Sequence, residues 1–179
     1  MPAQAPETIT TARLVLRRPR PEDAQAIFQD YAQDSEVTRF LSWTRHKDIA
    51  ETQAFLAGCP ERFDTGVEPA WVITFPSNDR ALGMIGCRLN GWMAGIGYCL
   101  ARPHWNQGLM CEAAGALVEW ALTLPQIYRV WAVCHVSNRA SARVMEKVGM
   151  LQEGLLRRWA SCPNLSPEPQ DCLIYARTR

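Results

Sequence analysis

Residues 95–113, GIGYCLARPHWNQGLMCEA, decide the fold of this chain. The first half alternates small and apolar residues and favours a β-strand over residues 95–101, and the second half favours a helix from about Leu109. Gly108 stands between them, where a residue without a Cβ lets the backbone turn sharply and approach a ligand. Residues 104–110 contain no Asp, Ser or Thr to cap the start of this helix. An uncapped helix start attracts phosphate, although an ordinary strand-to-helix turn would have the same sequence.

A second helix start lies farther along the chain, at Asn138-Arg139-Ala140-Ser141. Asn138 is a favourable N-cap, and Gly149 suits the left-handed position past the end of a helix over residues 138–148. This helix also follows a predicted strand, at residues 129–136. The two helices therefore begin next to the carboxyl ends of two strands, the place where open α/β sheets bind ligands.

The same reading of periodicity and turn residues extends outward to both ends of the chain. It predicts strands at residues 13–18, 70–75, 81–89, 95–101, 129–136, 151–159 and 171–177. It predicts helices at residues 21–31, 48–62, 109–124 and 138–148. Residues 1–10 are expected to be loose, and Pro163, Pro167 and Pro169 are expected to form a loop. We expect one domain over residues 1–179, with its core at about 8–178.

Composition excludes several classes of protein. The chain has 179 residues, of which 47% are apolar and 21% charged, as is usual for globular proteins. Lys plus Arg is 19 and Asp plus Glu is 18, so the net charge of +1 does not suggest a nucleic-acid partner. The apolar runs are too short to span a membrane, and the first residues do not resemble a signal peptide. A cytoplasmic protein is expected.

Seven cysteines raise the question of a metal or redox site. No two lie within three residues of each other, so no paired zinc or disulfide motif is present. Most have apolar neighbours, as in Tyr98-Cys99-Leu100. We therefore expect small buried hydrophobic residues in a reducing compartment and no bound metal, with a catalytic cysteine as the minor alternative.

Five separated segments, in this order, resemble the GNAT superfamily of N-acetyltransferases. They are TARLVLRRPRPEDA (11–24), GMIGCRLNG (83–91), residues 95–113 quoted above, VSNRASARVMEKVGMLQEGLLRRW (136–159) and DCLIYA (171–176). Within that superfamily the chain is most similar to the RimJ/RimL branch, whose members acetylate the N-terminal amines of proteins. The resemblance covers residues from about 8 to 177.

The resemblance implies an α/β (α+β) fold with acetyl-CoA as the donor. A mostly antiparallel mixed sheet of about seven strands and about four helices is expected. The strands at residues 95–101 and 129–136 would splay apart to form the CoA cleft. Backbone groups of Tyr98, Cys99, Leu100 and Ala101 would bind the pantetheine arm. The pyrophosphate would rest on Asn106, Gln107, Gly108, Leu109 and Met110, and Asn138 and Ser141 would lie beside the pantetheine and the sulfur.

The expected catalytic groups follow from the same resemblance and from two positions at which this chain differs from the family pattern. Many relatives carry a Tyr that protonates the departing thiolate, but Met145 occupies that position and cannot donate a proton, so Ser141 is the best remaining acid. Many also carry a Glu before the Ile-Gly-Tyr run, where this chain has Gly95. His135 is a candidate base, since its ordinary pKa suits proton transfer at neutral pH, but a hydrogen-bonded wall residue would look the same.

In the family, the loop that joins the first helices can border the pocket for the acceptor. In this chain that loop contains Trp43, Arg45 and His46, which are therefore the expected acceptor-binding residues. The expected reaction is direct attack of a primary amine on acetyl-CoA in a ternary complex. The amine would belong to a protein N-terminus or to a small molecule, and the enzyme would be a monomer or a homodimer. Gly95 and Met145 leave an alternative open, a catalytically weak or inactive CoA-binding regulatory module.

Overall fold

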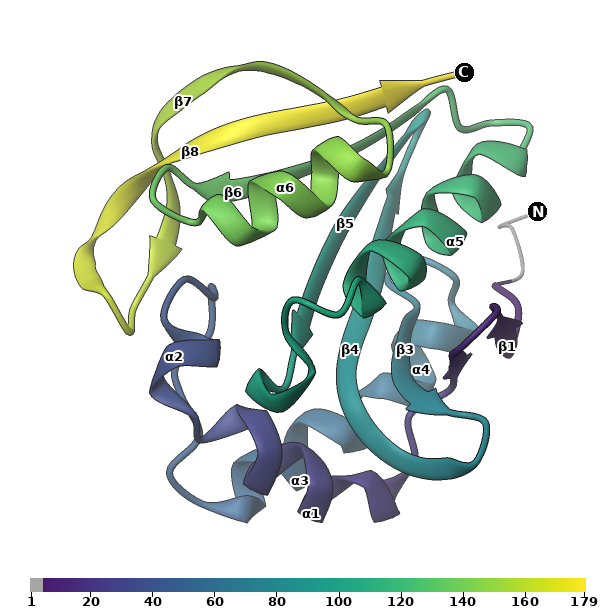
Figure 1. Ribbon diagram of the computed structural model, residues 1–179, viewed down its shortest axis with the longest axis vertical. Coiled ribbons are helices and arrows are strands. Elements are labelled where there is room, and N and C mark those ends of the chain that lie inside the picture. Colours follow the sequence, from purple (N-terminus) through teal and green to yellow (C-terminus); the bar gives the residue numbers. More distant parts are fainter. Residues whose placement is uncertain (1–4) are drawn as a thin grey trace.

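A computed structural model describes residues 5–179 and contains one eight-stranded mixed sheet (Figure 1). Its strands are β1 (Thr8–Thr10), β2 (Val15–Arg17), β3 (Ala70–Phe75), β4 (Asn78–Asn90), β5 (Met93–Leu100), β6 (Arg129–His135), β7 (Leu151–Cys162) and β8 (Ser166–Thr178). Its α-helices are α1 (Ala24–Ile27), α2 (Ser35–Thr38), α3 (Ile49–Ala57), α4 (Cys59–Asp64), α5 (Leu109–Thr123) and α6 (Arg139–Lys147). The spatial order of the strands is β1-β2-β3-β4-β5-β6-β8-β7, with antiparallel pairing everywhere except between β5 and β6.

The expected α/β class and mostly antiparallel sheet are confirmed, but the element counts differ. The sheet has an additional strand because Thr8–Thr10, expected to be loose, pairs with β2. The helix expected over residues 48–62 is two helices, which meet at Gly58 just before Pro60. The helix expected over residues 21–31 is divided into a 3₁₀ turn, α1 and a π-helical turn over Phe28–Ala32.

The proline loop near the C-terminus is shorter than expected. Pro167 and Pro169 belong to β8, so the connection to β7 is only the turn at residues 163–165. The pairing between β6 and β8 begins at the His135–Cys172 pair, so β8 has no second neighbour before Cys172. A strand with an unpaired edge tolerates proline, because no ladder hydrogen bond is lost there.

Alternating residues of the central strands pack against helices on both faces of the sheet. Ile73 and Ile85 belong to a buried cluster with Leu117 and Val118 of α5. The neighbouring residues Val72 and Met84 belong to a second cluster, with Ile27 of α1 and Leu56 of α3. Figure 1 shows α5 and α6 lying together across the sheet and α1 and α3 gathered at its lower end. The period of two along each strand therefore places helices on both sides.

The two central strands diverge. β5 and β6 pair in parallel only over Met93–Gly95 and Arg129–Trp131. Beyond these three pairs, residues 96–100 of β5 run without a strand on the side of β6. The expected splay between these strands is confirmed, and it leaves backbone N–H and C=O groups of β5 available to a ligand.

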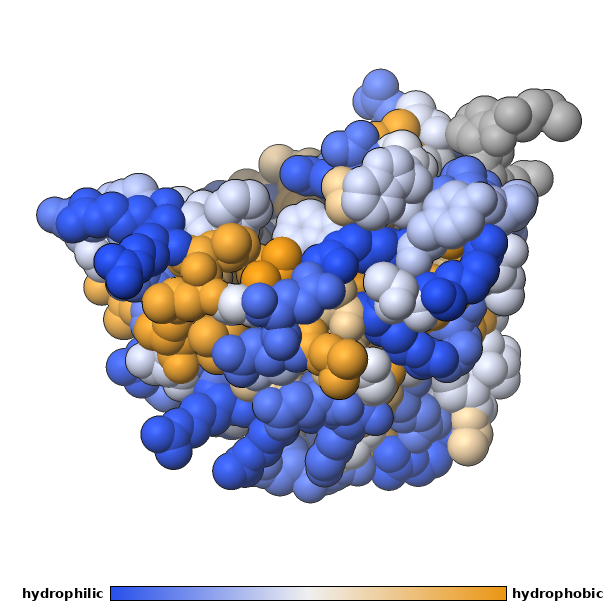
Figure 2. Space-filling model, turned by 90° about the horizontal axis from the view of Figure 1, so that it is seen from above, coloured by the Kyte–Doolittle hydropathy of each residue, from blue (hydrophilic) through white to orange (hydrophobic). Residues whose placement is uncertain are grey.

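Figure 2 looks onto the side of the molecule where β7 and β8 lie, and it shows apolar side chains gathered among charged ones. The exposed apolar residues of β7 include Leu151, 75% exposed, and Leu155, 49% exposed.

Within residues 5–179, every helix is too short or too polar to cross a membrane.

Candidate active site

A cleft of about 530 Å³ opens where β5 and β6 diverge. Its walls are the end of β5, the loop to α5, the starts of α5 and α6, and the segment from α2 to Leu41. Nine of the residues expected to bind cofactor line it: Tyr98, Cys99, Leu100, Asn106, Gly108, Leu109, Met110, Asn138 and Ser141. Two others, Ala101 and Gln107, lie outside the lining.

The start of α5 has the geometry expected of a phosphate site. Gly108 is the N-cap, with a left-handed φ of 75°, and no side chain caps the helix. Asn106 is also left-handed, with φ of 60°. Successive N–H groups therefore face the cleft without a competing side chain. A Cβ at Gly108 would be strained at this φ, and it would lie 3.6 Å from the guanidinium of Arg13.

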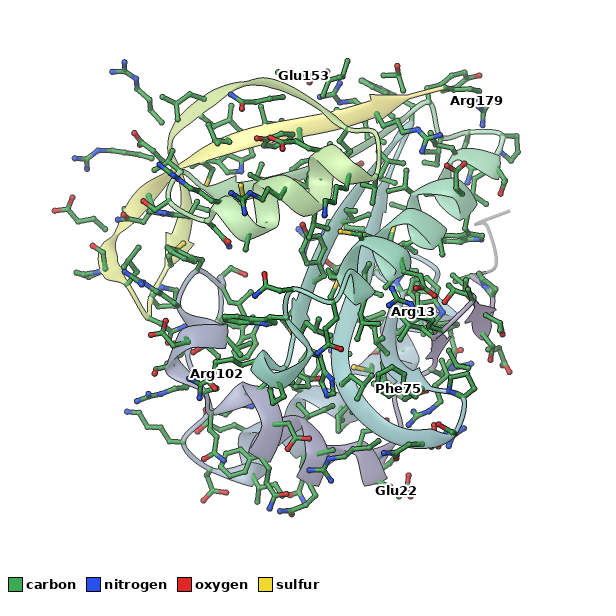
Figure 3. The ribbon with its side chains drawn as sticks, in the orientation of Figure 1. Arg13, Glu22, Phe75, Arg102, Glu153 and Arg179 are labelled. Atoms are coloured by element: carbon green, nitrogen blue, oxygen red, sulfur yellow. The ribbon has the colours of Figure 1, made fainter. Side chains whose placement is uncertain are left out.

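Arg13 holds this loop in place from β2's side of the sheet, a role the sequence did not reveal. Its guanidinium donates to the carboxylate of Glu112 (2.6 Å) and to the carbonyl of Gln107 (3.1 Å). Figure 3 shows Arg13 beside the beginning of α5. Glu112 lies in the first turn of α5, where the helix dipole favours an acid. Gln107 therefore shapes the loop through its backbone and does not contact the cleft.

Ser141 lies at the meeting point of α6 and β5. The side chain of Asn138 accepts the Ser141 N–H (3.1 Å), which confirms Asn138 as the N-cap of α6. The Tyr98 hydroxyl oxygen lies 2.9 Å from Ser141 Oγ and 3.2 Å from the Ser141 carbonyl oxygen, so its single proton can be donated to either of them. Sequence reasoning assigned only the backbone of Tyr98 to the site, because the contact joins residues 43 positions apart.

Burial controls the chemistry of this hydroxyl pair. Burial raises the pKa of Tyr98, and the hydrogen bond with Ser141 opposes that shift only in part. Tyr98 is therefore a neutral donor at physiological pH. Met145, the residue in place of the relatives' Tyr, is only 1% exposed and packs in the core, outside the cleft lining.

The absence of a carboxylate at position 95 also has a packing reason. A Cβ on Gly95 would lie 2.9 Å from Cζ2 of Trp131. The indole of Trp131 therefore occupies the space into which any side chain at this position would extend.

His135 forms part of the wall behind the cleft. Its ring stacks on Phe40, with 4.9 Å between centroids, and its Nδ1 accepts the N–H of Ser137 at 3.0 Å. Phe40 lines the cleft, but His135 does not. An imidazole that accepts at Nδ1 carries its proton on Nε2 when neutral, so in this arrangement His135 has no free lone pair with which to act as a base.

The loop with Trp43, Arg45 and His46 does not line the cleft. Asn164, in the β7–β8 turn, donates to the Trp43 carbonyl (2.8 Å) and accepts the Arg45 N–H (2.8 Å). His46 is 2.7 Å from Thr52 Oγ1, and burial lowers its pKa. These contacts give the loop a structural task, and its contact with an acceptor stays a prediction.

All seven cysteines lie in the described part of the chain, and all are free thiols. Burial raises the pKa of Cys99 and of Cys134 to about 11. A thiol with so high a pKa is protonated at neutral pH and is a poor nucleophile. Across residues 5–179, no three His, Cys, Asp or Glu side chains are placed together to hold a metal ion.

Most of the charged residues that line the cleft are positive. The charged lining residues are Arg39, Arg139, Arg143, Lys147 and Glu36. Glu36 is on α2, whose N-cap Asp34 also pairs with Arg102, labelled near α2 in Figure 3. The cleft therefore combines a positive wall with unpaired backbone N–H groups, which suits a long ligand with several phosphates.

Comparison with known proteins agrees with this geometry. Residues 13–151 match the family model described as an acetyltransferase (GNAT) domain. The N-acetyltransferase p20 of Bacillus licheniformis, itself uncharacterized, is 30% identical over 155 residues, which cover 84% of this chain and 86% of p20.

Two solved structures share the fold. One is RimL, a ribosomal alpha-N-protein acetyltransferase in complex with coenzyme A, with a TM-score of 0.85, 22% identity and coverage of 96% of this chain and 98% of RimL. The other is the self-immunity acetyltransferase MccE in complex with acetyl-CoA and AMP, with a TM-score of 0.86, 18% identity and coverage of 98% of each chain. Both are less than 25% identical to this chain, so the likeness concerns the fold alone.

Proposed function

Since this chain belongs to the GNAT family of acetyltransferases and takes acetyl-CoA as its donor, we propose that its acceptor is a primary amine, on a protein N-terminus or a small molecule. The observation that carries this proposal is the Tyr98–Ser141 hydroxyl pair inside the cleft. It places a proton donor where β5 and the start of α6 meet, and it supports transfer over mere binding of CoA.

Acetyl-CoA supplies an acetyl group on a thioester, which an amine attacks directly. Ser141 is proposed to donate a hydrogen bond to the sulfur as the thiolate departs, and Tyr98 to hold Ser141. The single proton of the Tyr98 hydroxyl can be donated to the Ser141 carbonyl or to Ser141 Oγ; when it is donated to Oγ, the Ser141 proton is free to point into the cleft. Asn138 fixes the first turn of α6 and so the backbone of Ser141.

Water, and not a strong protein base, is proposed to take the proton of the amine. Gly95 has no carboxylate, and Nδ1 of His135 is already an acceptor for a backbone N–H. Holding amine and thioester in line supplies much of the acceleration that such a reaction needs.

The acceptor is proposed to approach from α2. Glu36 is the one carboxylate among the residues that line the cleft, and it would attract an ammonium group before deprotonation. Glu36→Gln should raise KM for the acceptor severalfold with little change in Kd for acetyl-CoA. An unchanged acceptor KM would remove Glu36 from this role.

The alternative function is that of a regulatory module that binds CoA without transferring its acetyl group. Its basis was that Gly95 and Met145 replace the Glu and Tyr that many relatives carry. Both residues are explained by packing, against Trp131 and in the core respectively. Release of free thiol from acetyl-CoA, measured with peptides of differing first residue and with polyamines, tests the proposal. No amine-dependent release across such a panel would contradict it.

We also propose a cytoplasmic enzyme that is a monomer or a homodimer, on the basis of its free thiols and the absence of a membrane-spanning helix in the described residues. Light scattering on the purified chain distinguishes the two assembly states.

A further inference from the structure

Gly97 lies in the interior of β5, where a glycine weakens a strand. Its φ is not positive, so the backbone conformation does not require a glycine there. A Cβ built on Gly97 would have nothing within 4 Å beyond its neighbours in the chain, so packing does not require a glycine either. The residue is exposed although β5 is a central strand. A bare strand backbone with open space above it is typical of a place where another molecule approaches closely.

Gly97 belongs to the face of β5 that is turned away from the expected donor site. Tyr98, the next residue, faces α6 through its contact with Ser141. Strand side chains alternate between faces, so Gly97 and Cys99 share the opposite face, where Cys99 packs against the buried cluster of α1 and α3. With the thioester at the Tyr98–Ser141 pair, the donor occupies one face and the amine attacks from the other. The group attached to the amine nitrogen then lies over Gly97.

The side chains around Gly97 on this face are apolar or aromatic. β6 runs parallel to β5 and presents Trp131, Val133 and His135 to the same face, in that order. The indole of Trp131 extends to β5, where it covers the position two residues before Gly97. The ring of His135 stacks on Phe40, which lines the cleft. Gly97 therefore lies between an indole and a pair of stacked rings, and none of these residues is an acid, a lysine or an arginine.

We propose that Gly97 determines which acceptor the enzyme takes, and that this acceptor is a primary amine with an aromatic group a few bonds from its nitrogen. The inference rests on the proposed transfer to an amine, and it names the class of that amine. The aromatic group would lie flat on the backbone of Gly97 and contact the indole of Trp131 in an offset or edge-on arrangement. Two sources share this chemistry, an arylalkylamine and a peptide whose first residue is aromatic.

Other amines are poorer occupants of the space over Gly97. Spermidine, or a peptide that begins with lysine, would place a second charge against apolar side chains, where the loss of hydration is not offset. Glu36 of the cleft lining is on α2, and its proposed role concerns the amine that reacts. A small aliphatic amine would leave the space empty and gain no affinity from it.

The wild-type enzyme should show this preference when thiol release is measured. Phenethylamine should have a kcat/KM at least about tenfold above that of ethylamine, because burial of an aromatic ring is worth at least that factor. A peptide that begins with Phe should exceed the same peptide beginning with Gly by a similar factor. The pair with the larger ratio identifies the source, a small molecule or a protein N-terminus.

Gly97→Val fills the open space with a side chain that suits a strand. It should lower kcat/KM at least about tenfold for phenethylamine and for the peptide that begins with Phe. It should change kcat/KM for ethylamine and the Kd for acetyl-CoA by less than about twofold. Gly97→Ala should give an intermediate loss with the aromatic acceptors.

Gly154→Val is the matched control. Gly154 also has nothing within 4 Å of a Cβ, but it lies on β7, the outer strand of the sheet, with β6 and β8 between it and β5. This variant should behave as the wild type with every acceptor. Circular dichroism and thermal melting confirm that the variants fold.

Four results would overturn the assignment of Gly97. They are a wild-type ratio near one, spermidine as the best acceptor, a Gly97→Val variant that keeps the aromatic preference, and one that loses ethylamine activity as strongly as phenethylamine activity, which would show a structural role. In each of these cases the wild type still releases thiol with an amine, so the proposed transfer stands. Absence of release with every amine would refute the transfer itself and this inference with it.

Discussion

The hydroxyl pair in the cleft gives the sharpest test of the mechanism. Tyr98 Oη lies 2.9 Å from Ser141 Oγ and 3.2 Å from the Ser141 carbonyl oxygen. If Ser141 is the group that meets the departing thiolate, Tyr98 acts only through it. Removing either hydroxyl should slow the chemical step, and removing both should cost little more than removing Ser141 alone.

The magnitude follows from these roles. General acid help is typically worth about 10²- to 10⁴-fold, and a thiolate is a tolerable leaving group, so Ser141→Ala should lower kcat by roughly tenfold to a hundredfold. Tyr98→Phe removes a hydrogen bond of about 1 kcal/mol and should lower kcat about fivefold. Neither change should alter the Kd for acetyl-CoA more than about threefold.

The assay is thiol release at saturating acetyl-CoA, with chemistry shown to be rate-limiting. The double variant should match Ser141→Ala within a factor of about two, whereas independent effects would multiply. Met145→Leu is the matched control, because Met145 packs in the core near Ser141 on the same helix but does not line the cleft. A Ser141→Ala variant with a kcat within twofold of wild type would refute the acid role and leave the proton to water.

Three further predictions concern binding, reactivity and stability. Gly108→Asp places a like charge at the phosphate site and a strained φ at the helix start, so the Kd for acetyl-CoA should rise at least about tenfold; an unchanged Kd in a folded variant would contradict the site. Cys99→Ala should cost more stability than activity, since the raised pKa of this thiol makes it a poor nucleophile; an acetylated cysteine that passes its acetyl group to the amine would show the opposite. Arg17→Met leaves the buried Asp23 without its partner 2.7 Å away, so urea denaturation should show a loss of about 3–5 kcal/mol in unfolding free energy; a loss below 1 kcal/mol would show that Asp23 finds other partners.

Local features of the chain were predictable because their causes are local. Gly108, in a segment with no Asp, Ser or Thr, indicated the start of α5, and in the structure Gly108 is the N-cap and no side chain caps the helix. Asn138 and Gly149 delimit α6 by the same capping chemistry. The two helix starts at one end of two adjacent strands follow from element order alone.

Other features depended on which parts of the chain come together. Thr8–Thr10 form a strand because they pair with β2. The sequence of these three residues does not indicate that an unpaired strand edge lies beside them. The covering of Gly95 by Trp131 arises because those residues are partners in the short parallel pairing of β5 with β6. In the sequence, Gly95 indicated the loss of a catalytic carboxylate. In the fold, the indole of Trp131 fills the space that a side chain at this position would need.

The sequence by itself indicated the family, through its resemblance to the GNAT superfamily, and the starts of α5 and α6, because helix caps and turns depend on neighbours in the chain. Only the tertiary structure decided which side chains share the cleft. It brought Tyr98 to Ser141 and kept Met145, His135 and the loop with Trp43 out of the lining. The physical reason is that hydrogen bonds and proton transfer require distances of a few ångströms. Between residues far apart in sequence, those distances are set by how the strands diverge and by which side of each helix packs on the sheet.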